Sequence, residues 1–166
     1  MTSNEDLFII AELSVALAGF SGVVVGLRRR TGALSRQDVF GMIHILTSSG
    51  TAMVFSLLPS VLQAAGVGGA AAWRTTSLAL GLLVTVASLA WASAGRRTRP
   101  RYPVTFWGFV STGLVVGISL LLTSSGLFEY AGSLVPLTLL WLLLVAFSQF
   151  VAFLAVLWAP PEPDGP

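Results

Sequence analysis

The chain has 166 residues, of which 55% are hydrophobic and only 10% are charged, and its mean hydropathy is +0.86. A typical soluble domain carries about 25% charged residues, and a soluble chain of this length leaves much of its surface in contact with water. The composition therefore excludes a soluble globular fold and predicts a protein that is solvated by lipid.

Five apolar stretches are long enough to cross a membrane, since a spanning helix needs about 20 mostly apolar residues. In chain order they cover residues 7–27, 39–62, 75–94, 104–122 and 134–158. Lipid offers no hydrogen-bond partner to backbone N–H and C=O groups, so a spanning segment must be a helix or a barrel strand. These runs are too long and too uniformly apolar for barrel strands, so each stretch is expected to be a helix. The sequence predicts an all-α transmembrane bundle over residues 1–159 and a disordered cytoplasmic tail over residues 160–166.

The fourth and fifth stretches are separated only by a short connection over residues 123–133. This connection is polar at Ser124, Ser125 and Glu129. If it were buried as a re-entrant turn, the number of crossings would change. Two separate spans are the main prediction, and the re-entrant turn is the alternative.

Eight of the nine basic residues lie in two clusters, one after the first stretch and one after the third. They are Arg28, Arg29, Arg30, Arg36, Arg96, Arg97, Arg99 and Arg101. Cytoplasmic connections carry an excess of arginine and lysine, and with five spans both clusters fall on the same side. We therefore expect the N-terminus outside and the C-terminus in the cytoplasm, and we interpret the basic charge as a topology signal rather than a nucleic-acid surface.

The first stretch combines an acidic residue with a series of small residues. Glu12 lies in its outer half. An ionised carboxylate in the hydrocarbon is unfavourable, so the Glu12 side chain is expected to be protonated, to face water or to bond to a donor on another helix. Small residues at spacing four let helix backbones approach closely. The predicted packing face consists of Ser14, Ala18, Gly19, Gly22 and Gly26, with Gly113 and Gly117 on the fourth stretch. We expect the first helix to be a packing helix, with Glu12 facing protein rather than lipid.

The second stretch carries a polar stripe made of His44, Ser48 and Thr51, which share one helical face. Gln149 is the corresponding polar position in the fifth stretch. The stripe fits either interhelical hydrogen bonds or the wall of a hydrated path in which His44 titrates. Glu12 and His44 lie at depths about four turns apart, so a direct pair within one chain is not expected.

The residue types that are absent exclude several kinds of chemistry. The chain has no cysteine and no lysine, which removes thiol nucleophiles, thiolate metal ligands and Schiff-base cofactors. One histidine among scattered carboxylates falls short of a metal site, and Ser48 beside His44 has no orienting acid or oxyanion hole for hydrolysis. We expect no metal, no cofactor and no enzymatic activity.

These features predict a small membrane protein of structural or interaction type in a bacterial cytoplasmic membrane. It would assemble through its first helix, as a homo-oligomer or within a larger membrane complex. The alternative is an oligomeric ion or proton channel in which Glu12 and the His44–Ser48–Thr51 stripe line the path.

Overall fold

The computed structural model describes residues 4–28, 36–98, 103–125 and 131–158, which form five helices. They are α1 (Asn4–Arg28), α2 (Arg36–Ala64), α3 (Gly69–Thr98), α4 (Pro103–Ser124) and α5 (Ala131–Trp158). All five are long and apolar enough to span a membrane. The prediction of an all-helical membrane protein with five helices of spanning length is therefore confirmed. The predicted tail over residues 160–166 lies outside the described residues.

The largest difference from the predicted boundaries lies at the start of α3. This helix begins at Gly69, six residues before the predicted position, because the preceding turn is very short. Gly66 adopts a positive φ of 88°, which glycine tolerates without strain, and the backbone N–H of Ala72 already bonds to the carbonyl of Gly68. The fourth and fifth predicted stretches form separate helices, α4 and α5, and each has its own apolar window of spanning length.

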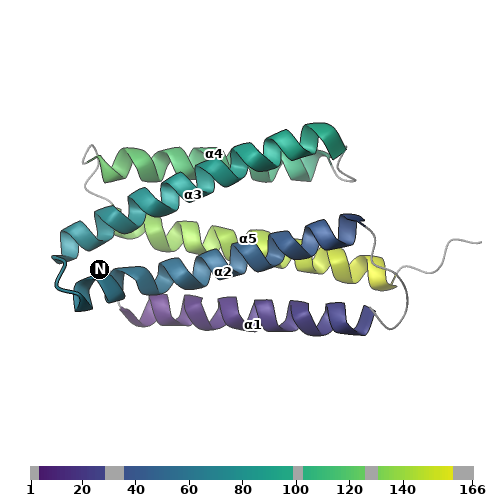
Figure 1. Ribbon diagram of the computed structural model, residues 1–166, viewed down its shortest axis with the longest axis horizontal. Coiled ribbons are helices and arrows are strands. Elements are labelled where there is room, and N and C mark those ends of the chain that lie inside the picture. The colour runs from purple at the N-terminus through teal and green to yellow at the C-terminus, as the bar shows by residue number, and fades with distance from the viewer. Residues whose placement is uncertain (1–3, 29–35, 99–102, 126–130, 159–166) are drawn as a thin grey trace, which may run out of the picture.

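The helices form two groups that meet along a looser boundary (Figure 1). One group contains α1, α2 and α5, with α2 packed against both partners, and the other is the closely packed pair α3 and α4. The described residues of α1 contact only α2 and α5, so α1 lies at one edge of the bundle. This arrangement leaves one side of α1 without a partner in its own chain.

The apolar core joins both groups and includes residues from every helix. Its buried members are Leu7, Ile10, Ala52, Leu80, Val84, Leu120, Val135, Leu139 and Leu142. Most buried hydroxyl groups within the helices donate to a carbonyl one turn earlier. Examples are Ser14 to Ile10 (2.7 Å) and Thr76 to Ala72 (2.8 Å). Such internal bonds satisfy polar groups where no water is available.

Several glycines lie in the contact between α3 and α4, among them Gly81, Gly113 and Gly117. A Cβ on Gly117 would lie 3.0 Å from the backbone nitrogen of Thr85 and 3.2 Å from the carbonyl oxygen of Gly81, and it would overlap the Thr85 hydroxyl. A Cβ on Gly81 would lie 3.0 Å from the Cβ of Leu120. Gly113 lies against Ser88 and the ring of Trp141 in the same way. Gly113 and Gly117 of the predicted packing face thus both lie against α3, and at Gly117 the two helix backbones approach each other closely.

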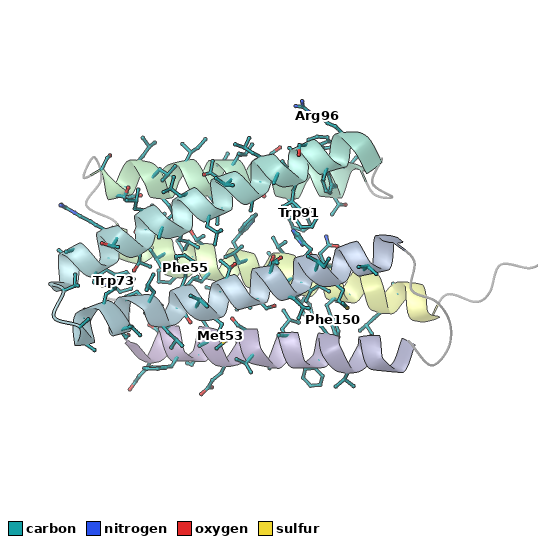
Figure 2. The ribbon with its side chains drawn as sticks, in the orientation of Figure 1. Met53, Phe55, Trp73, Trp91, Arg96 and Phe150 are labelled. Atoms are coloured by element: carbon teal, nitrogen blue, oxygen red, sulfur yellow. The ribbon has the colours of Figure 1, made fainter. Side chains whose placement is uncertain are left out.

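The helix ends that carry the arginine clusters lie at one end of the bundle, at the right of Figure 1. Arg28 ends α1 and Arg36 begins α2, while Arg96 and Arg97 lie in the last turn of α3. The Arg96 side chain is exposed and points away from the bundle (Figure 2). The remaining members of the predicted set, Arg29, Arg30, Arg99 and Arg101, lie outside the described residues.

Candidate functional site

Two features stand out on the described helices: a cavity between the two helix groups and the outer surface of α1. The cavity has a volume of about 430 Å³ and is lined by α2, α3, α4 and α5. It occupies the half of the bundle nearer the arginine-bearing helix ends, since its α2 wall runs from Gly41 to Thr51 and its α3 wall ends at Trp91. The predicted stripe of His44, Ser48 and Thr51 and the predicted Gln149 all line it.

His44 is held against an aromatic ring from the opposite helix group. Its ring meets Trp91 of α3 edge to face, with the ring centroids 4.4 Å apart and the ring planes at 90°. Trp91 points from α3 toward α2 and α5 (Figure 2). Edge-to-face contacts between rings are favourable and directional, so this contact fixes the orientation of the imidazole. Its Nδ1 atom is buried and has no hydrogen-bond partner.

The hydroxyl groups on the cavity wall differ in how they are bonded. Thr47 donates to the carbonyl of Ile43 at 2.7 Å, following the usual pattern of a membrane helix. Ser48, Thr51 and Ser88 form no hydrogen bond with the described residues. Together with His44, Thr47 and Gln149, these side chains are polar members of a cavity wall that is mostly apolar.

Part of the cavity wall on α2 and α3 is made of residues that are also exposed at the surface of the bundle. They include Thr47, Gly50 and Leu83. These residues lie inside the apolar windows Gly41–Ala64 and Gly69–Arg96, away from the ends of the helices.

The small residues of α1 do not all lie on one face. Ser14 is buried against the rest of the chain and Ala18 is half-buried, whereas Gly19, Gly22 and Gly26 are exposed. Four residues advance a helix by about 400°, so each step of four turns the series by about 40°. Over the three steps from Ser14 to Gly26 the series therefore winds from the inner side of α1 to its open side.

The open side of α1 has a regular pattern of its own. Exposed residues follow each other at alternating spacings of four and three: Phe8, Glu12, Val15, Gly19, Gly22 and Gly26. We call this set the outer face of α1. A Cβ added to any of its three glycines would meet no atom within 4 Å. None of the described residues on other helices therefore packs against these three glycines.

Glu12 lies on this outer face. It is exposed and falls seven residues, or about 10 Å, into the apolar window that begins at Glu5. Glu12 does not face the described helices of its own chain, because the inward side of α1 is occupied by Leu7, Ile10 and Ser14. Contact with a second protein chain remains a prediction.

The structure brings His44, Ser48, Thr51 and Gln149 to one cavity but leaves Glu12 outside it. Sequence reasoning missed Trp91, which completes the wall around His44. The spacing about the turn could have predicted this contact. His44 lies 22 residues before Gly66 and Trp91 lies 25 residues after it, so two antiparallel helices joined near Gly66 place both residues at similar depth. The described residues contain no group of acidic or histidine side chains that could hold a metal ion.

Comparison with protein-family models, with curated proteins and with solved structures gives no match to this chain.

Proposed function

We propose that this chain is a non-catalytic membrane subunit in which the outer face of α1 joins two copies within the bilayer. The observation that carries the proposal is the open space around Gly19, Gly22 and Gly26. Glycine in a helix is less favourable than alanine by about 0.5–1 kcal/mol, and no contact with the described residues requires it at these positions. A second helix backbone approaching this face would give all three glycines a packing role.

The spacing on the outer face fits a parallel pair of α1 helices. Alternating steps of four and three residues keep one line of contact between two helices that cross at about 20°. Copies of one chain insert in the same orientation, so a two-fold axis along the membrane normal places each residue near its own equivalent. The contact would then be centred on Val15 and Gly19.

Glu12 supports a second copy over an unrelated partner. Close to the two-fold axis, each Glu12 would face the Glu12 of the other copy. Carboxyl groups that face each other can each donate and accept one hydrogen bond. In such a pair, each Glu12 would supply the hydrogen-bond partner of the other, so no further polar residue would be needed to shield the carboxyl groups from lipid.

Cysteine crosslinking tests the proposal directly, because the chain has no cysteine of its own. A Val15→Cys variant, oxidised in native membranes, is expected to form a covalent dimer of twice the 17.4 kDa chain mass. A disulfide requires the two Cα atoms to lie about 4.4–6.8 Å apart, a distance that only residues near the two-fold axis can reach. The readout is the dimer band on a non-reducing gel.

Val86→Cys is the matched control, since Val86 is exposed on α3, far from the outer face of α1. It should remain monomeric under the same oxidation. Equal crosslinking of both variants would indicate random collision in the membrane. A Val15→Cys product of another mass would show that the partner of α1 is a different protein and not a second copy. Either result contradicts the proposal.

Substitutions of Glu12 test the carboxyl pair. Glu12→Gln should retain association, because an amide also donates and accepts hydrogen bonds. Glu12→Leu should weaken it roughly 3- to 20-fold, the range expected for interhelical hydrogen bonds of about 0.6–1.7 kcal/mol. Association can be measured by energy transfer between labelled copies in liposomes. Tighter association of Glu12→Leu would show that Glu12 does not lie in the contact.

The position of the basic residues supports one orientation in the membrane. We propose that the N-terminus lies outside and the C-terminus in the cytoplasm of a bacterial cell, because the arginine-bearing helix ends lie together at one end of the bundle.

The alternative function, an oligomeric ion or proton channel, has one observation in its favour: the His44–Ser48–Thr51 stripe lines a cavity. Glu12 lies outside that cavity, so one chain does not place both groups on a common path. Ion flux through purified protein in liposomes that falls in both Glu12→Gln and His44→Ala would favour this alternative over the subunit.

A further inference from the structure

The cavity between the two helix groups has the dimensions of a ligand site. Its volume of about 430 Å³ falls within the range of about 300–1,000 Å³ that is usual for small-molecule sites. Protein interiors otherwise contain few voids larger than a water molecule. A cavity of this size, at the junction of two separately packed helix groups, is a structural feature that requires its own explanation.

The side chains around the cavity favour an uncharged ligand. No aspartate, glutamate or arginine is among the lining residues, all of which belong to the described helices. A charged molecule would therefore enter an apolar environment without a counter-ion, which is strongly unfavourable. The same argument disfavours a metal ion or a phosphate in this position.

Aromatic rings occupy three of the four helices that form the wall. Trp91 comes from α3, Phe106 and Phe109 from α4, and Trp141 from α5. Aromatic side chains offer flat surfaces on which a ring can stack or meet another ring edge to face. The shape and chemistry of the wall therefore favour a flat ring over a branched or purely aliphatic molecule.

The cavity wall offers polar groups to a ligand. The imidazole of His44 and the hydroxyl-bearing side chain of Ser48, one turn further along the same face of α2, both line the cavity. Leaving a buried polar atom unpaired costs about 1–3 kcal/mol. A ligand hydroxyl can donate or accept a hydrogen bond, so it can pair with either tautomer of the imidazole.

From these observations we infer that the cavity binds an uncharged, lipid-soluble ring molecule that carries a hydroxyl group, of the phenol or hydroquinone class. The ring lies among the tryptophan and phenylalanine side chains, and its hydroxyl pairs with the imidazole of His44. The proposed route of entry runs from the lipid phase between α2 and α3, where Thr47, Gly50 and Leu83 line the cavity and are exposed. The inference is independent of association through α1.

Three related probes test the chemistry: 2-naphthol, naphthalene and 2-naphthoate at neutral pH. Each is equilibrated by dialysis between protein in detergent and protein-free micelles, so that partitioning into detergent is subtracted. We expect one molecule of 2-naphthol per chain, bound about tenfold more tightly than naphthalene, the factor that corresponds to one buried hydrogen bond. We expect 2-naphthoate, which is charged, to show no saturable binding.

Two variants locate the site. His44→Phe keeps a ring against Trp91 but removes both ring nitrogens, so it should bind 2-naphthol and naphthalene equally. Ala87→Leu places three further carbons in the cavity wall and should abolish binding of both, whereas Ala90→Leu, at an exposed position outside the cavity on the same helix, should bind as the wild type does. Circular dichroism and gel filtration confirm that each variant is folded.

Several outcomes would overturn the inference. Equal affinity of the wild type for 2-naphthol and naphthalene would make the cavity a hydrocarbon site, such as one for a lipid acyl chain. Tighter binding of 2-naphthoate would show that the ligand is charged. Unchanged binding in a folded Ala87→Leu variant would place the bound molecule elsewhere on the protein. If Ala87→Leu does not fold, the loss of discrimination in His44→Phe decides the question.

Discussion

Gly19→Leu is expected to separate the two copies while leaving each chain folded. Gly19 lies at the middle of the outer face of α1, where a leucine side chain would hold the second helix away from the backbone. Overpacking of a close contact costs about 1–3 kcal/mol, which corresponds to roughly 5- to 150-fold weaker association. Energy transfer between labelled copies in liposomes, over a range of protein-to-lipid ratios, measures the change.

The same substitution should not destabilise the single chain. A Cβ at Gly19 meets no atom within 4 Å, and leucine is a better helix former than glycine by somewhat less than about 1 kcal/mol. Gly108→Leu is the matched control, because Gly108 is also exposed and open but lies on α4. Association that weakens equally in both variants, or in neither, would remove the outer face of α1 from the contact.

The five helices could be predicted from the sequence because lipid imposes a simple requirement. A segment must be about 20 apolar residues long and must bond its own backbone, and both conditions can be judged one stretch at a time. The start of α3 was placed too late, because the predicted stretch began after Trp73 and Arg74. A helix can extend beyond the hydrocarbon and include such residues, so hydropathy alone does not locate its end.

The neighbour that each helix face contacts was harder to predict than the helix itself. Small residues at spacing four show that a close approach is possible, but they do not identify the neighbour. Gly113 and Gly117 meet α3 within the chain, whereas Gly22 and Gly26, with equal spacing, meet nothing. The difference arises from which helices are neighbours in the bundle, and a local sequence pattern does not specify those neighbours.

The candidate cavity shows the same limit. The polar stripe of His44, Ser48 and Thr51 follows from helical periodicity, and its members do line one wall. The other walls come from α3, α4 and α5, which the stripe does not specify. Trp91 could be located only by combining the stripe with the position of the turn at Gly66, because contact across a helix pair depends on where the chain reverses.

The two proposed sites lie on different sides of the bundle and should act separately. The outer face of α1 belongs to a helix that does not line the cavity, and α2 stands between them. Effects of substitutions that share no partner are usually additive within about 0.5 kcal/mol. Gly19→Leu should therefore leave 2-naphthol binding unchanged, and His44→Phe should leave association unchanged, so failure of one proposal does not imply failure of the other.

Gly117→Leu is expected to produce the largest loss of stability. Unlike Gly19, this residue lies in a completed contact: its Cβ would be 3.0 Å from the backbone nitrogen of Thr85 and 3.2 Å from the carbonyl oxygen of Gly81. Backbone atoms cannot rotate away as side chains can, so α3 and α4 would have to separate. We expect a loss of about 3 kcal/mol, at the upper end of the range for overpacking.

Unfolding of detergent-solubilised protein by sodium dodecyl sulfate, followed by circular dichroism, measures this loss. Gly117→Ala should show a smaller decrease, because the Thr85 hydroxyl can move but the two backbone atoms remain in place. Gly108→Leu, on the same helix but in open space, should unfold as the wild type does. The contrast between two glycines of one helix ties the effect to the α3–α4 contact, since helix propensity acts alike at both positions and favours leucine. Wild-type stability in Gly117→Leu would show that α3 and α4 do not approach each other at Gly81 and Gly117.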